Sequence, residues 1–81
     1  MTSVDKIFKG YAEEFFGKEC VERCLTDEMI EESRVYAFRT HNEMMEKLSL
    51  EDARTLMDEW KANGVEPIKE LFLNHIFGEY I

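Results

Sequence analysis

Hydrophobic residues recur with a helical period along almost the whole chain. The pattern predicts a first helix over about residues 3–16, ended by Gly17, with Phe16 pointing away from the apolar side. That apolar side consists of Val4, Ile7, Phe8, Tyr11, Ala12 and Phe15. A short second helix follows over about residues 18–24. Its inward positions are Cys20, Val21 and Cys24.

Two longer helices are predicted in the middle of the chain. Thr26 is a typical N-cap for a helix over about residues 27–48, because acids occupy the first turn. Its apolar stripe consists of Ile30, Ala37, Phe38, His41, Met44, Met45 and Leu48, with Arg34 among them. Ser49 and Asp52 resemble a capping box for the next helix, which Asn63 and Gly64 end. The apolar face of that helix consists of Leu50, Ala53, Leu56, Met57 and Trp60.

The last helix is predicted to begin at Pro67, which suits the first helical position. One of its faces consists of Ile68, Leu71, Phe72, His75 and Ile76. A second apolar face, formed by Leu73, Phe77 and Tyr80, lies roughly opposite. A helix that is apolar on both sides lies within a core or covers a partner. We therefore regard Leu73, Phe77 and Tyr80, together with Phe16 and Tyr36, as candidate interface residues.

These elements predict the fold class. Strand-like alternation, internal repeats and low-complexity segments are absent, and 44% of the 81 residues are hydrophobic. A chain of this length supports one core. We expect an all-α protein, a compact bundle of four to five helices, with residues 1–81 in a single domain.

Charge adds the strongest functional signal. Eighteen Asp and Glu residues oppose ten Lys and Arg residues, which gives a net charge of −8. Eight of the acids lie between residues 13 and 32, with only Lys18 and Arg23 among them, so this stretch carries −6 of the total. The acidic run consists of Glu13, Glu14, Glu19, Glu22, Asp27, Glu28, Glu31 and Glu32. It serves solubility or faces a partner with a basic surface.

The same composition disfavours several classes of protein. Acidity argues against direct binding to nucleic acid and to anionic membranes, where affinity comes from Lys and Arg. No stretch has the roughly 18 consecutive apolar residues of a membrane span. The N-terminal residues lack the uninterrupted apolar segment of a signal peptide. We expect a cytoplasmic protein.

Cys20 and Cys24 stand four residues apart, a spacing that places both thiols on one helical face. A soft metal would need two further ligands, and His41 and His75 show no partner spacing. The favoured interpretation is that both cysteines are small buried hydrophobes with inert thiols. We therefore predict no metal site and no cofactor.

Arg34 and His41 share an apolar stripe, so two interpretations are open. They could hold a carboxylate or a phosphate together. The favoured interpretation is structural, because a buried guanidinium needs a paired acid. The candidate acids for Arg34 are Glu13, Glu14 and Asp58.

Catalysis is not expected. Adjacent acids in the pairs 13–14, 31–32 and 58–59 diverge by about 100° on a helix, so they do not converge on one proton or ion. Sequence motifs for nucleotide-binding loops, calcium loops, zinc proteases and serine hydrolases are also absent.

The leading hypothesis is a non-enzymatic binding protein that inhibits or modulates a larger, basic, nucleic-acid-handling protein, such as a nuclease, a polymerase or a CRISPR effector. Carboxylates along rigid helices can imitate rows of phosphates. In composition the chain resembles the small acidic helical proteins that phages and mobile elements encode. The alternative is a helical homodimeric adaptor or regulator that associates through its C-terminal apolar face.

Overall fold

Five α-helices make up the computed structural model, which describes residues 2–64 and 66–81. The helices are α1 (Ser3–Phe16), α2 (Lys18–Cys24), α3 (Asp27–Glu46), α4 (Leu50–Ala62) and α5 (Pro67–Glu79). The described residues contain no strand. The predicted all-α fold with four to five helices is confirmed.

Side-chain caps explain where the helices begin. Thr2 and Asp5 form a capping box at α1, and the hydroxyls of Thr26 and Ser49 accept backbone hydrogen bonds at α3 and α4. α3 ends at Glu46, two residues earlier than predicted, because the N-cap Ser49 requires extended backbone. The short segment between the two helices must therefore make the turn.

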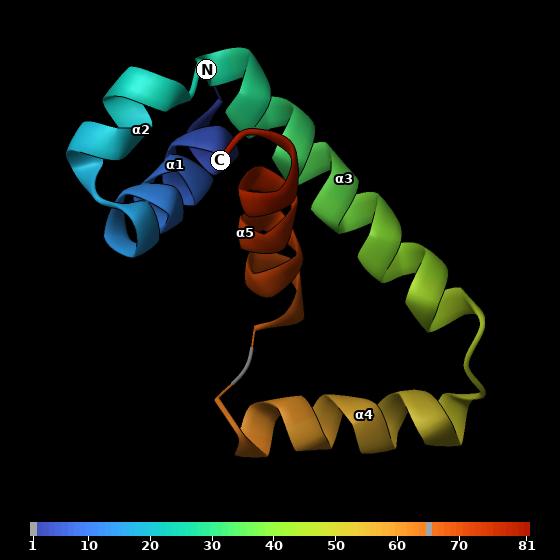
Figure 1. The fold of residues 1–81 in the computed structure, drawn as a ribbon. Helices are drawn as coiled ribbons and strands as arrows, with labels where there is room; N and C mark the ends of the chain where they lie inside the picture. Colours follow the sequence, from blue (N-terminus) through green and yellow to red (C-terminus); the bar gives the residue numbers. More distant parts are fainter. Residues whose placement is uncertain (1, 65) are drawn as a thin grey trace.

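The core lies where α5 packs against the first part of α3, with α1 packed against both of these helices and α2 against α1 (Figure 1). Phe72 is completely buried at its centre, and the Phe8 ring meets it edge to face at 5.0 Å. The buried hydrophobic residues are Phe8, Ala12, Val21, Leu25, Ile30, Ala37, Phe72 and Ile76. The core thus joins α1, α2, α3 and α5.

A buried ion pair connects α1 to α3. Asp5 is only 2% exposed, and its carboxylate accepts a hydrogen bond from Arg34 Nε and another from the Thr2 hydroxyl. The sequence-based assignment of the Arg34 partner to Glu13, Glu14 or Asp58 is therefore wrong. The physical requirement for a paired acid holds, but the acid that meets it is 29 residues away in sequence.

The same pair determines which side of α1 faces inward. Asp5, Phe8 and Ala12 are buried, and Phe16 packs against the core, whereas Phe15 is 67% exposed. The predicted orientations of Phe15 and Phe16 are therefore reversed. Burial of Asp5 turns the inward face of α1 towards Phe16, and this orientation leaves about half of the surface of Val4 and Ile7 exposed as well. The Phe15 ring remains edge to face with Phe16 at 4.9 Å.

α4 lies apart from the other four helices (Figure 1). None of its residues is buried, and Leu50 on its apolar face is 74% exposed. The ring contact of α4 with α3 is between Trp60 and His41, at 5.8 Å. Because α4 extends away from the core, the molecule is elongated, with dimensions of 43 × 24 × 22 Å.

We expect Asp5→Asn to lower the free energy of unfolding by about 3 kcal/mol, because it leaves the guanidinium of Arg34 in place without its charged partner. Asp27→Asn is the control, since Asp27 pairs with Lys9 at 3.9 Å and its side chain is 69% exposed. That substitution should change stability by at most about 0.5 kcal/mol. Urea unfolding measures both, and equal effects would contradict a structural role for the Asp5 pair.

The contribution of Asp5 depends on pH. Burial raises the pKa of Asp5, but the hydrogen bonds from Arg34 and Thr2 and the charge of Arg34 outweigh it, so the pKa lies below the ordinary 3.8. The stabilisation is therefore complete above about pH 5 and is lost as the pH falls through the lowered value. The difference in unfolding free energy between the wild type and Asp5→Asn should stay constant near neutral pH and shrink in acid.

Backbone amides of α4 should exchange with deuterium through local opening. A helix of 13 residues without buried side chains is marginally stable in water. Amides of α5 around Phe72 and Ile76 should exchange only on global unfolding, because both side chains are fully buried. Native-state hydrogen exchange followed by NMR distinguishes the two classes. Equal protection in α4 and α5 would show that α4 is held by more than the observed contacts.

Candidate protein-binding surface

The interface of α3 with α5 carries a polar network. Ser33, which is fully buried, shares a hydrogen bond of 2.8 Å with Nδ1 of His75. The His75 ring also lies against the Tyr36 ring, with centroids 4.4 Å apart. These contacts fix the positions of both rings on the surface of the core.

A second side-chain hydrogen bond joins the C-terminal end of α5 to α3. The Tyr80 hydroxyl donates a hydrogen bond of 2.6 Å to the Glu32 carboxylate. This bond raises the pKa of Tyr80 to about 12, with burial and the negative charges of Glu32 and Glu79 adding to the effect. Glu32 is thereby held in one position by the end of the chain.

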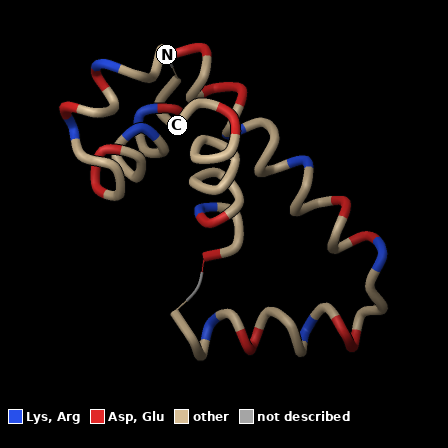
Figure 2. The backbone as a smooth tube through the Cα atoms, viewed as in Figure 1, with Lys and Arg blue, Asp and Glu red and all other residues tan. Residues whose placement is uncertain are grey.

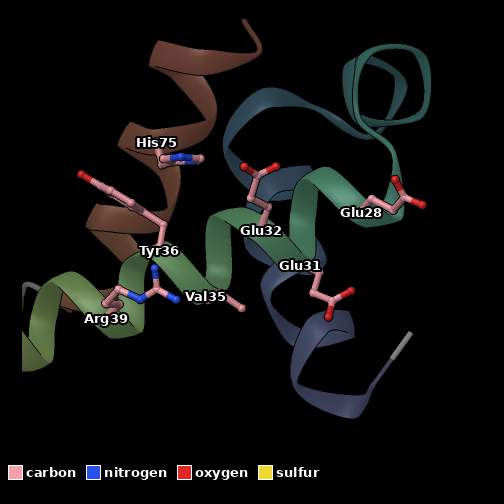
Figure 3. A pocket seen from close by; sticks show the side chains of 7 residues that line it. All are labelled: Glu28, Glu31, Glu32, Val35, Tyr36, Arg39 and His75. Atoms are coloured by element: carbon pink, nitrogen blue, oxygen red, sulfur yellow. The ribbon is translucent and has the colours of Figure 1, made fainter.

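Next to this network lies an open pocket of about 400 Å³ (Figure 3). Six of its lining residues come from α3 and one, His75, comes from α5. The lining consists of Glu28, Glu31, Glu32, Val35, Tyr36, Arg39 and His75. Three carboxylates and one guanidinium therefore line this pocket together with two neighbouring aromatic rings.

The acidic run occupies the surface of α1, α2 and the start of α3, and Figure 2 shows its residues at that end of the molecule. Seven of the eight acids are exposed and Glu13 is half-buried. Within residues 2–64 and 66–81, three have partners: Arg23 for Glu19 at 3.1 Å, Lys9 for Asp27, and Tyr80 for Glu32. The structure brings Glu28, Glu31 and Glu32 together at the pocket.

The predicted apolar anchors lie in two different environments. Phe16, Leu73 and Tyr80 are half-buried and pack against the core of their own chain. Phe77 is 64% exposed and remains available to a partner. Tyr36 is partly exposed beside the pocket. α5 thus contacts the core through both of its apolar faces, with Phe77 as the exposed exception.

The two cysteines are not both buried, so that interpretation is wrong for Cys24, which is exposed. Cys20 is half-buried, and its burial together with the neighbouring Cys24 thiol raises the pKa of Cys20 above the ordinary 9.0. A reactive thiol has a lowered pKa instead. Both thiols are free.

Arg34 and His41 do not form the joint anion site that was the less favoured of the two interpretations. Arg34 is bound to Asp5 and also lies over the Phe38 ring at 5.8 Å, whereas His41 faces Trp60. Among the described residues, no group of three or more His, Cys, Asp and Glu side chains is arranged to hold a metal ion. None of the helices in that part of the chain has the length and apolar character needed to cross a bilayer.

Two features of this surface, the burial of Ser33 and the contact of Tyr36 with His75, were not identified from the sequence. Ser33 lies three residues after Ile30 and four before Ala37, so helical spacing alone could have identified it as buried. The contact of Tyr36 with His75 had no comparable signal, because the two rings lie on helices separated by α4. Only the packing of α5 on α3 brings them together.

Comparisons with protein-family models, with curated proteins and with solved structures found no match.

Absorbance of tyrosinate should report the bond between Tyr80 and Glu32. We expect a titration component near pH 12 that is absent in Tyr80→Phe and moves to lower pH in Glu32→Gln. Because folding raises this pKa, the stabilisation is complete below about pH 10 and is lost as the pH rises through about 12. Superimposable titrations of the wild type and Glu32→Gln would contradict the bond.

Proposed function

We propose that this protein is a non-enzymatic binding protein that modulates a larger, basic, nucleic-acid-handling partner in the cytoplasm. It acts by covering the surface on which that partner binds nucleic acid. The observation that carries the proposal is the acidic run at one end of the molecule, exposed at seven of its eight positions. A nuclease, a polymerase or a CRISPR effector has a surface of the required kind, and the composition resembles that of inhibitors from phages and mobile elements.

The density of charge supports mimicry of phosphates. Glu28, Glu31 and Glu32 place three carboxylates along about 6 Å of the length of α3, at a rise of about 1.5 Å per residue. Duplex DNA carries one charge per about 1.7 Å of its axis, so the local densities are similar. Because α3 packs on the core, these charges sit on a rigid support.

Attraction and retention would come from different parts of the surface. The acids would steer the encounter, since long-range charge raises association rates more than it slows dissociation. Phe77 is the apolar anchor with the most exposed surface, and a few such side chains usually supply most of the binding energy. Raising salt from about 50 to 500 mM should therefore slow association more than it speeds dissociation.

The test begins with capture of partners from a bacterial lysate at low and high salt and their identification by mass spectrometry. A captured nucleic-acid-binding protein is then tested for displacement of its nucleic acid by this protein. Displacement that fails at every protein concentration would overturn the proposal, even if capture succeeds.

Matched charge variants separate recognition from solubility. The first variant changes four exposed acids of the acidic run to their amides: Glu14, Glu22, Glu28 and Glu31. The second changes four exposed acids outside the run: Glu43, Glu51, Asp58 and Glu59. Both have the same net charge. We expect the first to slow association at least about tenfold and the second to have little effect. Equal effects would mean that only net charge matters.

A homodimeric adaptor is the second candidate, favoured by the exposure of Phe77. Sedimentation of the wild type and of Phe77→Asp distinguishes the candidates. A dimer that the substitution breaks supports the adaptor, and a monomer in both cases supports the acidic binding protein. Leu73 is unsuitable for this test because it packs against the core, so a charge there would act on folding.

A further inference from the structure

The pocket between α3 and α5 differs from the rest of the acidic run, because carboxylates there adjoin aromatic rings (Figure 3). Glu32 projects from the same edge of α3 as Tyr36, beside His75, whereas Glu31 projects from the opposite edge and Glu28 lies one turn nearer the start of the helix. The Tyr36 and His75 rings have centroids 4.4 Å apart. A cation placed between Glu32 and the exposed part of the Tyr36 ring meets negative charge and a ring at the same time.

The walls of the pocket are held in place before any partner arrives. Ser33 binds His75 at 2.8 Å on the α5 side, and Tyr80 binds Glu32 at 2.6 Å on the α3 side. Groups that are already positioned lose little conformational entropy on binding. The pocket is therefore more than a concentration of charge, since its rings and at least one carboxylate have fixed positions.

The aromatic rings and the carboxylates together favour a guanidinium over an ammonium ion or a metal ion. A planar guanidinium can stack on a ring while its N–H groups donate to a carboxylate, whereas an ammonium ion acts as a point charge. The observed arrangement, with a partly exposed ring beside several carboxylates, suits the planar group. A metal ion is a poorer fit, because the described acids do not form a group that converges on one point.

We infer that this pocket receives an arginine side chain from the basic surface of the partner, an inference that rests on the function proposed above. Arg39 lines the opposite part of the pocket and has no ion pair with any described residue. Its positive charge opposes a second guanidinium. Arg39 thus sets the affinity of the pocket below what the three carboxylates would otherwise give.

The inference can be tested without an identified partner, with N-acetyl-arginine amide as the probe and N-acetyl-lysine amide as its comparison. The full chain labelled with ¹⁵N is titrated with each, and backbone amide shifts are followed by NMR. We expect saturable shifts at residues 28–39 and His75 with the arginine probe. The lysine probe should bind about fivefold more weakly.

Paired variants locate the binding site. Glu28→Gln with Glu31→Gln should weaken arginine binding severalfold, whereas Glu19→Gln with Glu22→Gln on α2 removes the same charge and should not. Tyr36→Phe keeps the ring and should bind normally, whereas Tyr36→Leu should bind about threefold more weakly. Arg39→Gln should bind about twofold more tightly. The substituted acids and Arg39 are exposed, so their variants should fold. Tyr36→Leu also removes the ring contact with His75, so its fold is checked by its amide spectrum.

Two results would overturn the inference: shifts of equal size on α2 and at the pocket, or equal binding of the arginine and lysine probes. Failure of the proposed function is a separate outcome. In that case arginine binds the pocket as described, but the protein displaces no nucleic acid from any captured partner. The pocket then stands as an arginine-binding site whose partner is not a nucleic-acid-handling protein.

Discussion

The ion pair between Asp5 and Arg34 is the constraint on which the arrangement of the helices depends. It joins the first turn of α1 to the middle of α3, and it draws a carboxylate into a position that a hydrophobic residue would otherwise occupy. Because a buried charge is tolerated only beside its partner, α1 has little freedom to rotate. The exposure of Phe15 and the partial burial of Phe16 both follow from this orientation.

Helical periodicity and capping residues were sufficient to place all five helices, and the bounds of α1 and α2 agree with the prediction. These features are local, so the sequence carries them directly. The partner of Arg34 could not be found in the same way, because it depends on which helices pack together. A Thr-x-x-Asp pattern at residues 2–5 was a signal for Asp5 as a capping residue, but nothing in it indicated burial.

On the candidate binding surface, too, some features are local in the sequence and others depend on how the helices pack. The exposure of the acids in the acidic run follows from their places on the polar sides of the helices. The contacts of His75 and Tyr80 with α3 required the docking of α5, which charge and periodicity do not encode. Apolarity on both sides of α5 offered two interpretations, and the structure shows most of that surface within the core.

The position of α4, apart from the core, allows its length and sequence to change without much effect on the other helices. α4 connects two helices of the core but buries none of its own residues, so its energetic role is mainly that of a long connection. The entropy of closing a connection rises slowly, by about 0.6 kcal/mol for each doubling of its length. Insertions, deletions and new surface residues in α4 therefore alter the stability of the core only slightly. Changes of this kind in α4 leave the geometry of the acidic end of the molecule unaltered.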